Sequence, residues 1–264
     1  MRPNTVREIW KRGEAVVNGW ISIPSSFSAE VMAHQGFDSL VVDMQHGVID
    51  YDTAIPLLQA ISTTPVIPLA RVPWNDPARL MKILDAGVYG IICPMVNTPA
   101  EADALVRACK YPPRGYRSWG PVRASIYAGG TDYATRANDE LIVMPMIETA
   151  EAVKNLDEIL SVPGVDAVYV GPSDLALSMG QMPKLDHDAA AVVDAQRTIV
   201  KLCKKHGKFA GIHNATAGYA QKMVGEGYQF VTLASDSRFL ALKAAEEVNA
   251  VRKGGIKAGV VPAY

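Results

Sequence analysis

The sequence has few cysteines, almost no net charge and no long apolar run. Its three cysteines, Cys93, Cys109 and Cys203, are odd in number and widely spaced, which argues against a disulfide framework or a thiolate metal site and suits a reducing cytoplasm. A formal net charge of -1 gives no long-range field that would attract nucleic acid or an anionic membrane. No stretch approaches the ~20 apolar residues of a membrane span, and the N-terminus lacks the apolar core of a signal peptide. We therefore expect a soluble cytoplasmic protein without nucleic-acid or membrane partners.

Short apolar runs alternate with amphipathic segments along the whole chain. The runs cover residues 15–22, 39–45, 66–72, 90–96, 141–148, 167–174, 209–214 and 230–236. The segments between them often open on Asp, Thr or Ser and close near Gly, as capped helices do. Runs that are apolar almost throughout are typical of parallel strands covered on both faces. The alternation predicts one α/β domain over residues 1–264, a (β/α)8 TIM barrel, with an open doubly wound sheet as the alternative.

Two connections differ from the rest. Residues 111–139, rich in Gly, Pro, Arg and aromatic residues, make the connection from the fourth to the fifth strand about twice as long as the others. We expect a long loop there, and such a loop inside a compact domain is typically functional. After Asp174 we expect a short helical turn and then a long helix from about His187 to His206.

Polar residues gather where the expected strands end. In a barrel of this kind, the chemistry lies where strands pass into the loops that follow them. None of these exits presents a lysine, so a Schiff-base mechanism has no obvious amine, and there is no GxSxG or Walker motif. His34, His187 and His206 fall elsewhere and are expected on the surface. The residues at the exits are Trp20, Asp43 with His46, Arg71, Glu148, Asp174, His213 and Asp236.

Glu148 and Asp174 end neighbouring strands, and their side chains can converge. Two adjacent carboxylates repel each other unless a proton or a cation lies between them. Oxygen ligands favour a hard divalent ion such as Mg²⁺ or Mn²⁺. Alternatively, each carboxylate caps its own helix; for the pair together we favour the metal site.

The remaining exits suggest substrate contacts. Free backbone N–H groups at the turn Gly171-Pro172-Ser173 can bind an anion such as a carboxylate. Arg71 can hold an oxyanion through several N–H donors, or form a structural ion pair with an acid such as Asp43. We expect Trp20 to wall the pocket.

His46 is a candidate general base because Asp43, Arg71 and the two carboxylates share its rim. For His213 and Asp236 a structural role is the stronger interpretation.

Six motifs together resemble the HpcH/HpaI aldolase family, and the resemblance runs from about Trp20 to the last helix. Members of that family are metal-dependent class II aldolases that cleave 4-hydroxy-2-oxo acids to pyruvate and an aldehyde. Their (β/α)8 barrels commonly form hexamers that exchange the last helix between neighbours. The motifs, in order, are VVDMQHG, LARVPW, MKILDAG, YPPRGYRS, MIET and YVGPSDLALSMG.

The resemblance implies roles for individual residues. His46 would be the base, acting through a metal-bound water, and Arg71 would stabilise the enolate oxygen. Asp43, together with Asp85 from an adjacent subunit, would raise the basicity of His46.

The resemblance also implies ligands. Glu148 and Asp174 would hold a divalent ion (Mg²⁺, Mn²⁺ or Co²⁺), and the backbone around Gly171, Pro172 and Ser173 would bind the pyruvate carboxylate. In the synthetic direction, pyruvate or hydroxypyruvate would add to an aldehyde.

Three positions depart from the family pattern: Gln45, where many members have Glu; Met146, where some have Gln; and Ser118, where the loop often has Gly. These changes concern the identity of the substrate rather than the type of reaction. Three other functions stay open. A CoA-thioester lyase of the citrate lyase β-chain type would need a basic channel, and no cluster of Lys and Arg is evident near the exits. A two-carboxylate glycosidase would be insensitive to EDTA, and a catalytically silent barrel would not respond to metal plus pyruvate.

Overall fold

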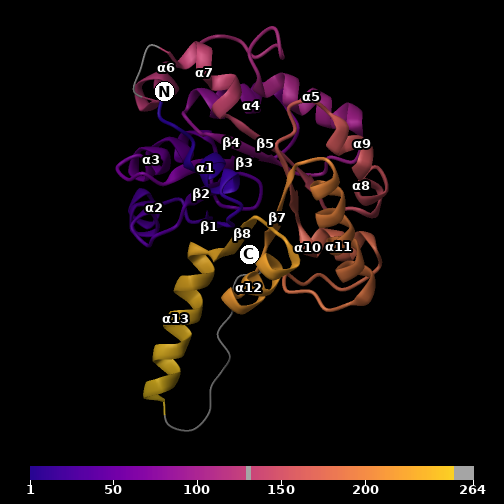
Figure 1. Cartoon of the computed structure of the whole chain (residues 1–264). Coiled ribbons are helices and arrows are strands. Elements are labelled where there is room, and N and C mark those ends of the chain that lie inside the picture. The colour runs from indigo at the N-terminus through magenta and orange to yellow at the C-terminus, as the bar shows by residue number, and fades with distance from the viewer. Residues whose placement is uncertain (129–131, 253–264) are drawn as a thin grey trace.

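The computed structural model describes residues 1–128 and 132–252, and its strands form one closed barrel (Figure 1). All neighbouring strands are parallel, and β1 closes the barrel by pairing with β8. The strands are β1 (Val16–Ile21), β2 (Ser39–Asp43), β3 (Ile67–Arg71), β4 (Gly90–Cys93), β5 (Ile142–Ile147), β6 (Ala167–Val170), β7 (Phe209–His213) and β8 (Phe230–Ser235). The predicted (β/α)8 barrel is confirmed, and the open doubly wound alternative is wrong.

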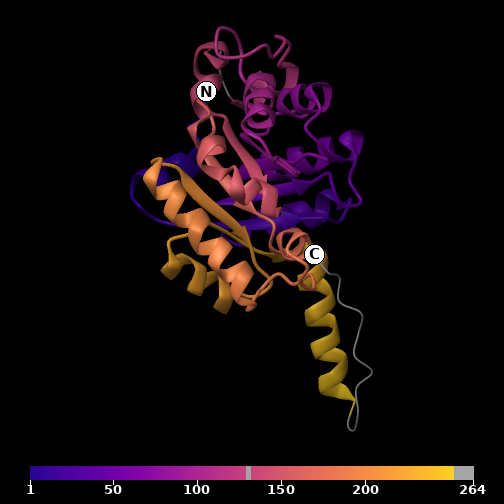
Figure 2. The ribbon, with the colours of Figure 1, turned by 90° about the vertical axis from the view of Figure 1, so that its right-hand side faces the viewer.

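Helices connect the strands and cover the outside of the barrel (Figure 2). Side-chain caps begin several of them, as the sequence predicts: Asp50 caps α3, Asp76 caps α4, and Thr98 forms a capping box with Glu101 at α5. The helices are α1 (Thr5–Lys11), α2 (Ser26–Ala33), α3 (Tyr51–Ile61), α4 (Pro77–Asp85), α5 (Pro99–Cys109), α6 (Val122–Ala128), α7 (Tyr133–Glu140), α8 (Ala150–Lys154), α9 (Leu156–Ser161), α10 (Pro172–Ser178), α11 (Ala190–Lys205), α12 (Ala217–Glu226) and α13 (Asp236–Val251).

A cluster of buried polar side chains lies among the strands. The Tyr169 hydroxyl donates to Thr232 Oγ1 at 2.7 Å and lies 3.1 Å from His213 Nδ1. Asn18 Nδ2 donates to the same threonine oxygen at 3.0 Å, and Ser39 Oγ donates to Asn18 Oδ1 at 2.7 Å. These strands were expected to be mostly apolar inside. The five polar groups are tolerated because they satisfy one another.

The segment 111–139 is not a long loop, because it contains α6 and most of α7. Aromatic packing gives it a small core of its own. The guanidinium carbon of buried Arg117 lies 4.4 Å from the Tyr111 ring centroid, and the Tyr111 ring lies 5.2 Å from Trp119 and 6.4 Å from Tyr133. The expectation of a long loop is therefore wrong, although residues 129–131 lie outside the described part.

The predicted long helix between β6 and β7 is confirmed as α11, but one neighbouring histidine was misjudged. His187 is buried, its Nε2 lies 3.1 Å from the Met182 carbonyl oxygen, and its Nδ1 accepts a hydrogen bond from the Ala189 N–H at 3.1 Å. This histidine closes the turn that leads into α11 instead of facing solvent.

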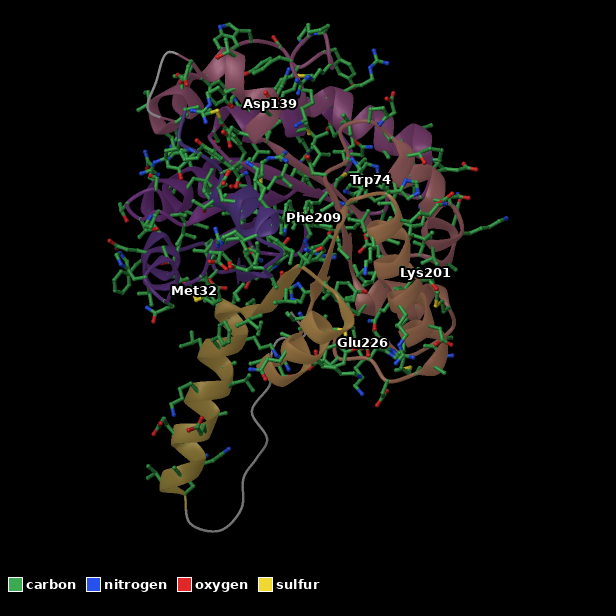
Figure 3. All side chains as sticks on the ribbon, in the orientation of Figure 1. Met32, Trp74, Asp139, Lys201, Phe209 and Glu226 are labelled. Atoms are coloured by element: carbon green, nitrogen blue, oxygen red, sulfur yellow. The ribbon has the colours of Figure 1, made fainter. Side chains whose placement is uncertain are left out.

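Helix α13 leaves the barrel and projects away from it (Figures 1 and 2). Its first residue, Asp236, is buried and accepts hydrogen bonds from the Ser22 N–H at 2.9 Å and from Ser28 Oγ at 2.8 Å, in keeping with a structural role. Beyond it, apolar side chains such as Leu240 and Val251 are exposed, and Figure 3 shows the side chains of α13 standing clear of the barrel. In the described part of the chain, no helix is long and apolar enough to cross a bilayer.

Candidate active site

Asp43 and Arg71 end neighbouring strands and face each other in register. Arg71 Nε donates to Asp43 Oδ1 at 2.8 Å, and Arg71 Nη2 donates to Oδ2 at 2.6 Å. Burial alone would raise the pKa of Asp43, but the charge and hydrogen bonds of Arg71 hold it below its ordinary value. The ion pair considered for Arg71 is therefore present, and it fixes the plane of the guanidinium at the exit of β3.

Trp20 contacts both members of this ion pair. Its Nε1 donates to Asp43 Oδ2 at 3.1 Å, and its ring lies 4.9 Å from the guanidinium carbon of Arg71. The indole also stacks on Tyr169 with centroids 5.8 Å apart and meets the edge of His213 at 4.8 Å. Through these contacts Trp20 connects the ion pair to the polar cluster inside the barrel. Its side chain is 0% exposed, so it lies deeper than an open pocket wall.

The turn after β2 explains why its apolar run ends in a polar tripeptide. The backbone N–H groups of Gln45 and His46 donate to Asp43 Oδ1 at 3.1 and 3.3 Å, so the aspartate folds its own following turn. A Cβ on Gly47 would collide with the Asp43 carbonyl oxygen, so the turn requires glycine. This geometry brings His46 to the rim.

His46 is solvent-exposed and electrostatically coupled to its neighbours. Partial burial of the ring and the charge of Arg71 lower the pKa of His46, while Asp43 and Asp174 act in the opposite direction. The net direction leaves the imidazole neutral near pH 7, the form that can accept a proton.

Glu148 follows β5 and is 2% exposed. The Met95 N–H donates to its Oε1 at 2.7 Å, and its Oε2 lies against Gly171, where a Cβ would collide with it. Burial and the charge of Asp174 raise the pKa of Glu148 to about 7, although the Met95 hydrogen bond and Arg71 oppose the shift.

Neither carboxylate is the N-cap of its helix. Thr149, the residue after Glu148, caps α8 by accepting from the Ala152 N–H. Gly171 is the N-cap of α10, with no side-chain cap bond, and Asp174 lies in the first turn of that helix. Helix capping therefore does not account for this pair.

The donor set fits a hard divalent ion. Burial is the largest cause of the raised pKa of Glu148, and the negative charge of Asp174 adds to it, so a cation between the two carboxylates would offset both the burial and the repulsion. Within residues 1–128 and 132–252, no group of three or more His, Cys, Asp or Glu side chains is arranged to hold a metal. With Glu148 and Asp174 as its ligands from this chain, a divalent ion would keep positions for substrate and water.

The other expected site residues lie at two places. Pro172, which is buried, and Ser173, which is partly buried, begin α10 beside Glu148 and Gly171. Asp85 ends α4 and accepts a hydrogen bond at 2.7 Å from Nη2 of Arg117 in the aromatic cluster of segment 111–139. Within one chain, the partner of Asp85 is therefore the segment 111–139.

Met95 is the contributor that sequence reasoning missed. It acts through its backbone N–H, and the exit of β4 carries no charged side chain that would have drawn notice. The signal in the sequence was indirect: the fourth apolar run is followed by Pro-Met-Val-Asn, at the exit of a strand.

Comparisons with known proteins show which family and fold this chain shares. The family model of HpcH/HpaI aldolase/citrate lyase matches residues 19–242. The chain is 43% identical over 245 residues to the hydroxypyruvate/pyruvate aldolase of Rhizorhabdus wittichii, covering 93% of this chain and 97% of that protein. It is 38% identical over 261 residues to the 4-hydroxy-2-oxo-heptane-1,7-dioate aldolase of Escherichia coli, covering 98% of each. A crystal structure of an HpcH/HpaI aldolase/citrate lyase family protein from Burkholderia cenocepacia superposes with a TM-score of 0.89 at 30% identity, over 95% of this chain and 100% of that one.

Proposed function

Because the chain belongs to the HpcH/HpaI aldolase/citrate lyase family and is a carbon–carbon lyase of the aldolase type, we propose how its barrel mouth performs the reaction. The substrates are 4-hydroxy-2-oxo acids, which are cleaved to pyruvate or hydroxypyruvate and an aldehyde, or formed from them. One observation carries the proposal. A neutral histidine, a fixed arginine and two coupled carboxylates meet at the carboxyl ends of β2, β3, β5 and β6.

We assign the metal to Glu148 and Asp174. Their oxygen donors suit Mg²⁺, Mn²⁺ or Co²⁺, and the repulsion between them is the feature that favours a cation. When bound, the ion supplies Lewis-acid stabilisation of the negative charge that develops on the oxo acid.

His46 transfers the proton, and Arg71 stabilises the negative charge that develops on the substrate. In the cleavage direction, His46 accepts the proton of the C4 hydroxyl, the C3–C4 bond breaks, and the aldehyde departs. The electron pair of that bond leaves an enolate whose C2 oxygen faces Arg71, which is held in place by Asp43. The backbone around Gly171 and Ser173 holds the carboxylate, while Pro172 has no N–H and shapes the turn. The proton that His46 accepted is then delivered to C3 of the enolate, which gives the oxo acid and returns the imidazole to its neutral form.

The assay is pyruvate release from 4-hydroxy-2-oxo-heptanedioate with and without EDTA. We expect EDTA to abolish the release and Mn²⁺ to restore it, and we expect Glu148→Gln to weaken Mn²⁺ binding. Glu30→Gln, a change on the outer helix α2, is the matched control. Cleavage at full rate by the metal-free enzyme would refute the metal role. The activity of a two-carboxylate glycosidase would not change on addition of EDTA.

We propose that the chain works as one (β/α)8 domain over residues 1–264 in a cytoplasmic homohexamer. The three cysteines are free and buried, as in a reducing compartment. The exposed apolar face of α13, with Leu240 and Val248, supports its exchange with a neighbouring subunit. From the family resemblance, and independently of that exchange, we propose that Asp85 at the end of α4 reaches the site of an adjacent subunit. The double variant Leu240→Asp and Val248→Asp should form smaller assemblies in analytical ultracentrifugation, whereas an unchanged assembly would argue against the exchange.

A further inference from the structure

Met95 has an unusual backbone. Its φ is 55°, in the left-handed region, and it is the one residue other than glycine with a positive φ in the described part of the chain. Residues with a Cβ rarely adopt this conformation, because the Cβ approaches the following carbonyl oxygen. Such conformations persist only where the surroundings enforce them, and they cluster at functional sites.

The unusual backbone aims one hydrogen bond. The Met95 N–H points at Glu148 Oε1, with 2.7 Å between nitrogen and oxygen. The second oxygen, Oε2, packs against Gly171 on the far side of β5, where a side chain could not fit. The loops after β4 and after β6 thus clamp the Glu148 carboxylate from two sides and leave little freedom for its rotation.

Neighbouring hydrogen bonds enforce the backbone of Met95. Asn97 Nδ2 donates to the Met95 carbonyl oxygen at 3.4 Å, and Asn97 Oδ1 accepts a hydrogen bond from the hydroxyl of Thr149. Asn155 Nδ2 donates to the Asn97 carbonyl oxygen at 2.9 Å. Since Thr149 directly follows Glu148, the loop that holds Met95 is anchored to the residue next to the carboxylate that it positions.

We propose that Met95 is a positioning residue whose left-handed backbone directs the Glu148 carboxylate and thereby sets the affinity of the site for a divalent ion. The inference rests on the proposed metal role of Glu148. It assigns the effect to the backbone conformation of Met95 and not to its thioether side chain.

The experiment measures the dissociation constant of Mn²⁺ on the full-length protein by electron paramagnetic resonance of the free ion. Met95→Asn and Met95→Gly replace the side chain with residues that accept a positive φ, so we expect Mn²⁺ affinity within about threefold of the unmodified protein. Met95→Val introduces a β-branched residue that is a strong outlier at positive φ, and we expect about tenfold or greater weakening.

Two further variants make the test decisive. Met182→Val makes the same substitution on a side chain that is 82% exposed, and should leave Mn²⁺ affinity unchanged. Asn97→Ala removes a hydrogen bond to the Met95 carbonyl oxygen without changing Met95, and should also weaken Mn²⁺ binding. This variant replaces Met95→Val in the test if Met95→Val does not fold.

The outcomes separate this inference from the proposed function. Equal Mn²⁺ affinity in Met95→Val, or in Asn97→Ala where Met95→Val does not fold, would overturn the positioning role while the metal role stands. An equal loss in the Asn, Gly and Val variants would overturn it as well, because the side chain would then carry the effect. Absence of Mn²⁺ binding by the unmodified protein would overturn the metal role of Glu148 and this inference with it.

Discussion

Arg71 and Asp43 form a buried two-point ion pair across the ends of β3 and β2, with N–O distances of 2.8 and 2.6 Å and side chains that are 2% and 1% exposed. The two points fix the plane of the guanidinium, which a single contact would leave free to rotate. An arginine held in this way is preorganised, so it does not need to reorient when charge develops on a substrate oxygen. The ion pair and the catalytic role considered for Arg71 are thus compatible.

Arg71→Lys tests that preorganisation. Lysine keeps the positive charge but not the planar fork, so it cannot bind Asp43 and a substrate oxygen with the same geometry. We expect kcat to fall by about 10²–10³, with a smaller change in KM. Arg79→Lys, on a side chain that is 63% exposed, is the matched control in a steady-state assay of pyruvate release. A kcat within threefold of that control would remove Arg71 from the mechanism.

His46→Asn tests the base through its pH dependence. The pKa of His46 lies below its ordinary value of 6.5, and the neutral ring is the active form. The unmodified enzyme should therefore keep its full rate from pH 8 to pH 7 and lose it only as the pH falls below about 6.5. In His46→Asn we expect kcat/KM to be lower by about 10²–10⁴ and this acidic decline to disappear. His34→Asn, on an exposed histidine of the same chain, should keep the decline. Persistence of the decline in His46→Asn would assign it to another group.

Trp20→Phe tests the support beneath the ion pair. Phenylalanine keeps an aromatic face for Arg71 but removes the N–H that binds Asp43 Oδ2. We expect a loss of about 1 kcal/mol in the free energy of unfolding and a fall in kcat with little change in KM, since Trp20 acts through Arg71. Trp74→Phe, on a rim residue that is 57% exposed and labelled in Figure 3, separates this effect from the general loss of an indole. A change in KM alone would instead indicate direct contact with the substrate.

Much of the fold was predictable because parallel strands in a barrel are buried on both faces and therefore stay apolar almost throughout. Closure of the barrel then brings all strand exits to one rim, so Asp43, Arg71 and Glu148 could be grouped from their places at strand ends alone. The charges of Asp43, Arg71 and Asp174 all act on the pKa of His46, which is consistent with that grouping, while the catalytic roles of these residues stay predictions.

Other parts of the site could not be predicted from the sequence, because they depend on the orientation of backbone groups and on side-chain packing, which residue types alone do not specify. Met95 contributes a backbone N–H, and every residue except proline carries one. Trp20 was expected at the pocket wall, but its depth in the barrel depends on packing against Tyr169 and His213. In segment 111–139, the first residue of α7, Tyr133, packs with Tyr111, which contacts Arg117, and these residues come from separated positions in the chain.

His213 allows a prediction about stability. It lies inside the barrel against Trp20 and Tyr169, and burial lowers its pKa to about 3. A pKa that is lower in the folded state means that the unfolded chain binds more protons between pH 3 and 6.5. The stability that neutral His213 contributes is therefore complete above about pH 6.5 and is lost as the pH falls toward 3.

Glu148 acts in the opposite direction in the metal-free protein. The pKa of Glu148 is about 7 in the folded protein, above the ordinary value of 4.5 that applies to the unfolded chain. The stability that protonated Glu148 contributes is therefore complete below about pH 4.5 and is lost as the pH rises toward 7. A single stability curve would mix the two effects. Subtracting the free energy of unfolding of His213→Asn from that of the unmodified protein cancels the contribution of Glu148, because both proteins contain Glu148.

We expect the stability advantage of the unmodified protein over His213→Asn to shrink by about 2 kcal/mol between pH 6.5 and pH 5, since one pKa unit corresponds to about 1.4 kcal/mol. Urea unfolding of both proteins at each pH, in the presence of EDTA, measures that difference. His34→Asn should instead give a nearly constant difference over the same range, because the side chain of His34 is exposed. Parallel curves for the unmodified protein and His213→Asn would show that His213 takes up a proton inside the folded barrel. In that case the cluster of Tyr169, Thr232 and Asn18 would have to accommodate a positive charge next to Arg71.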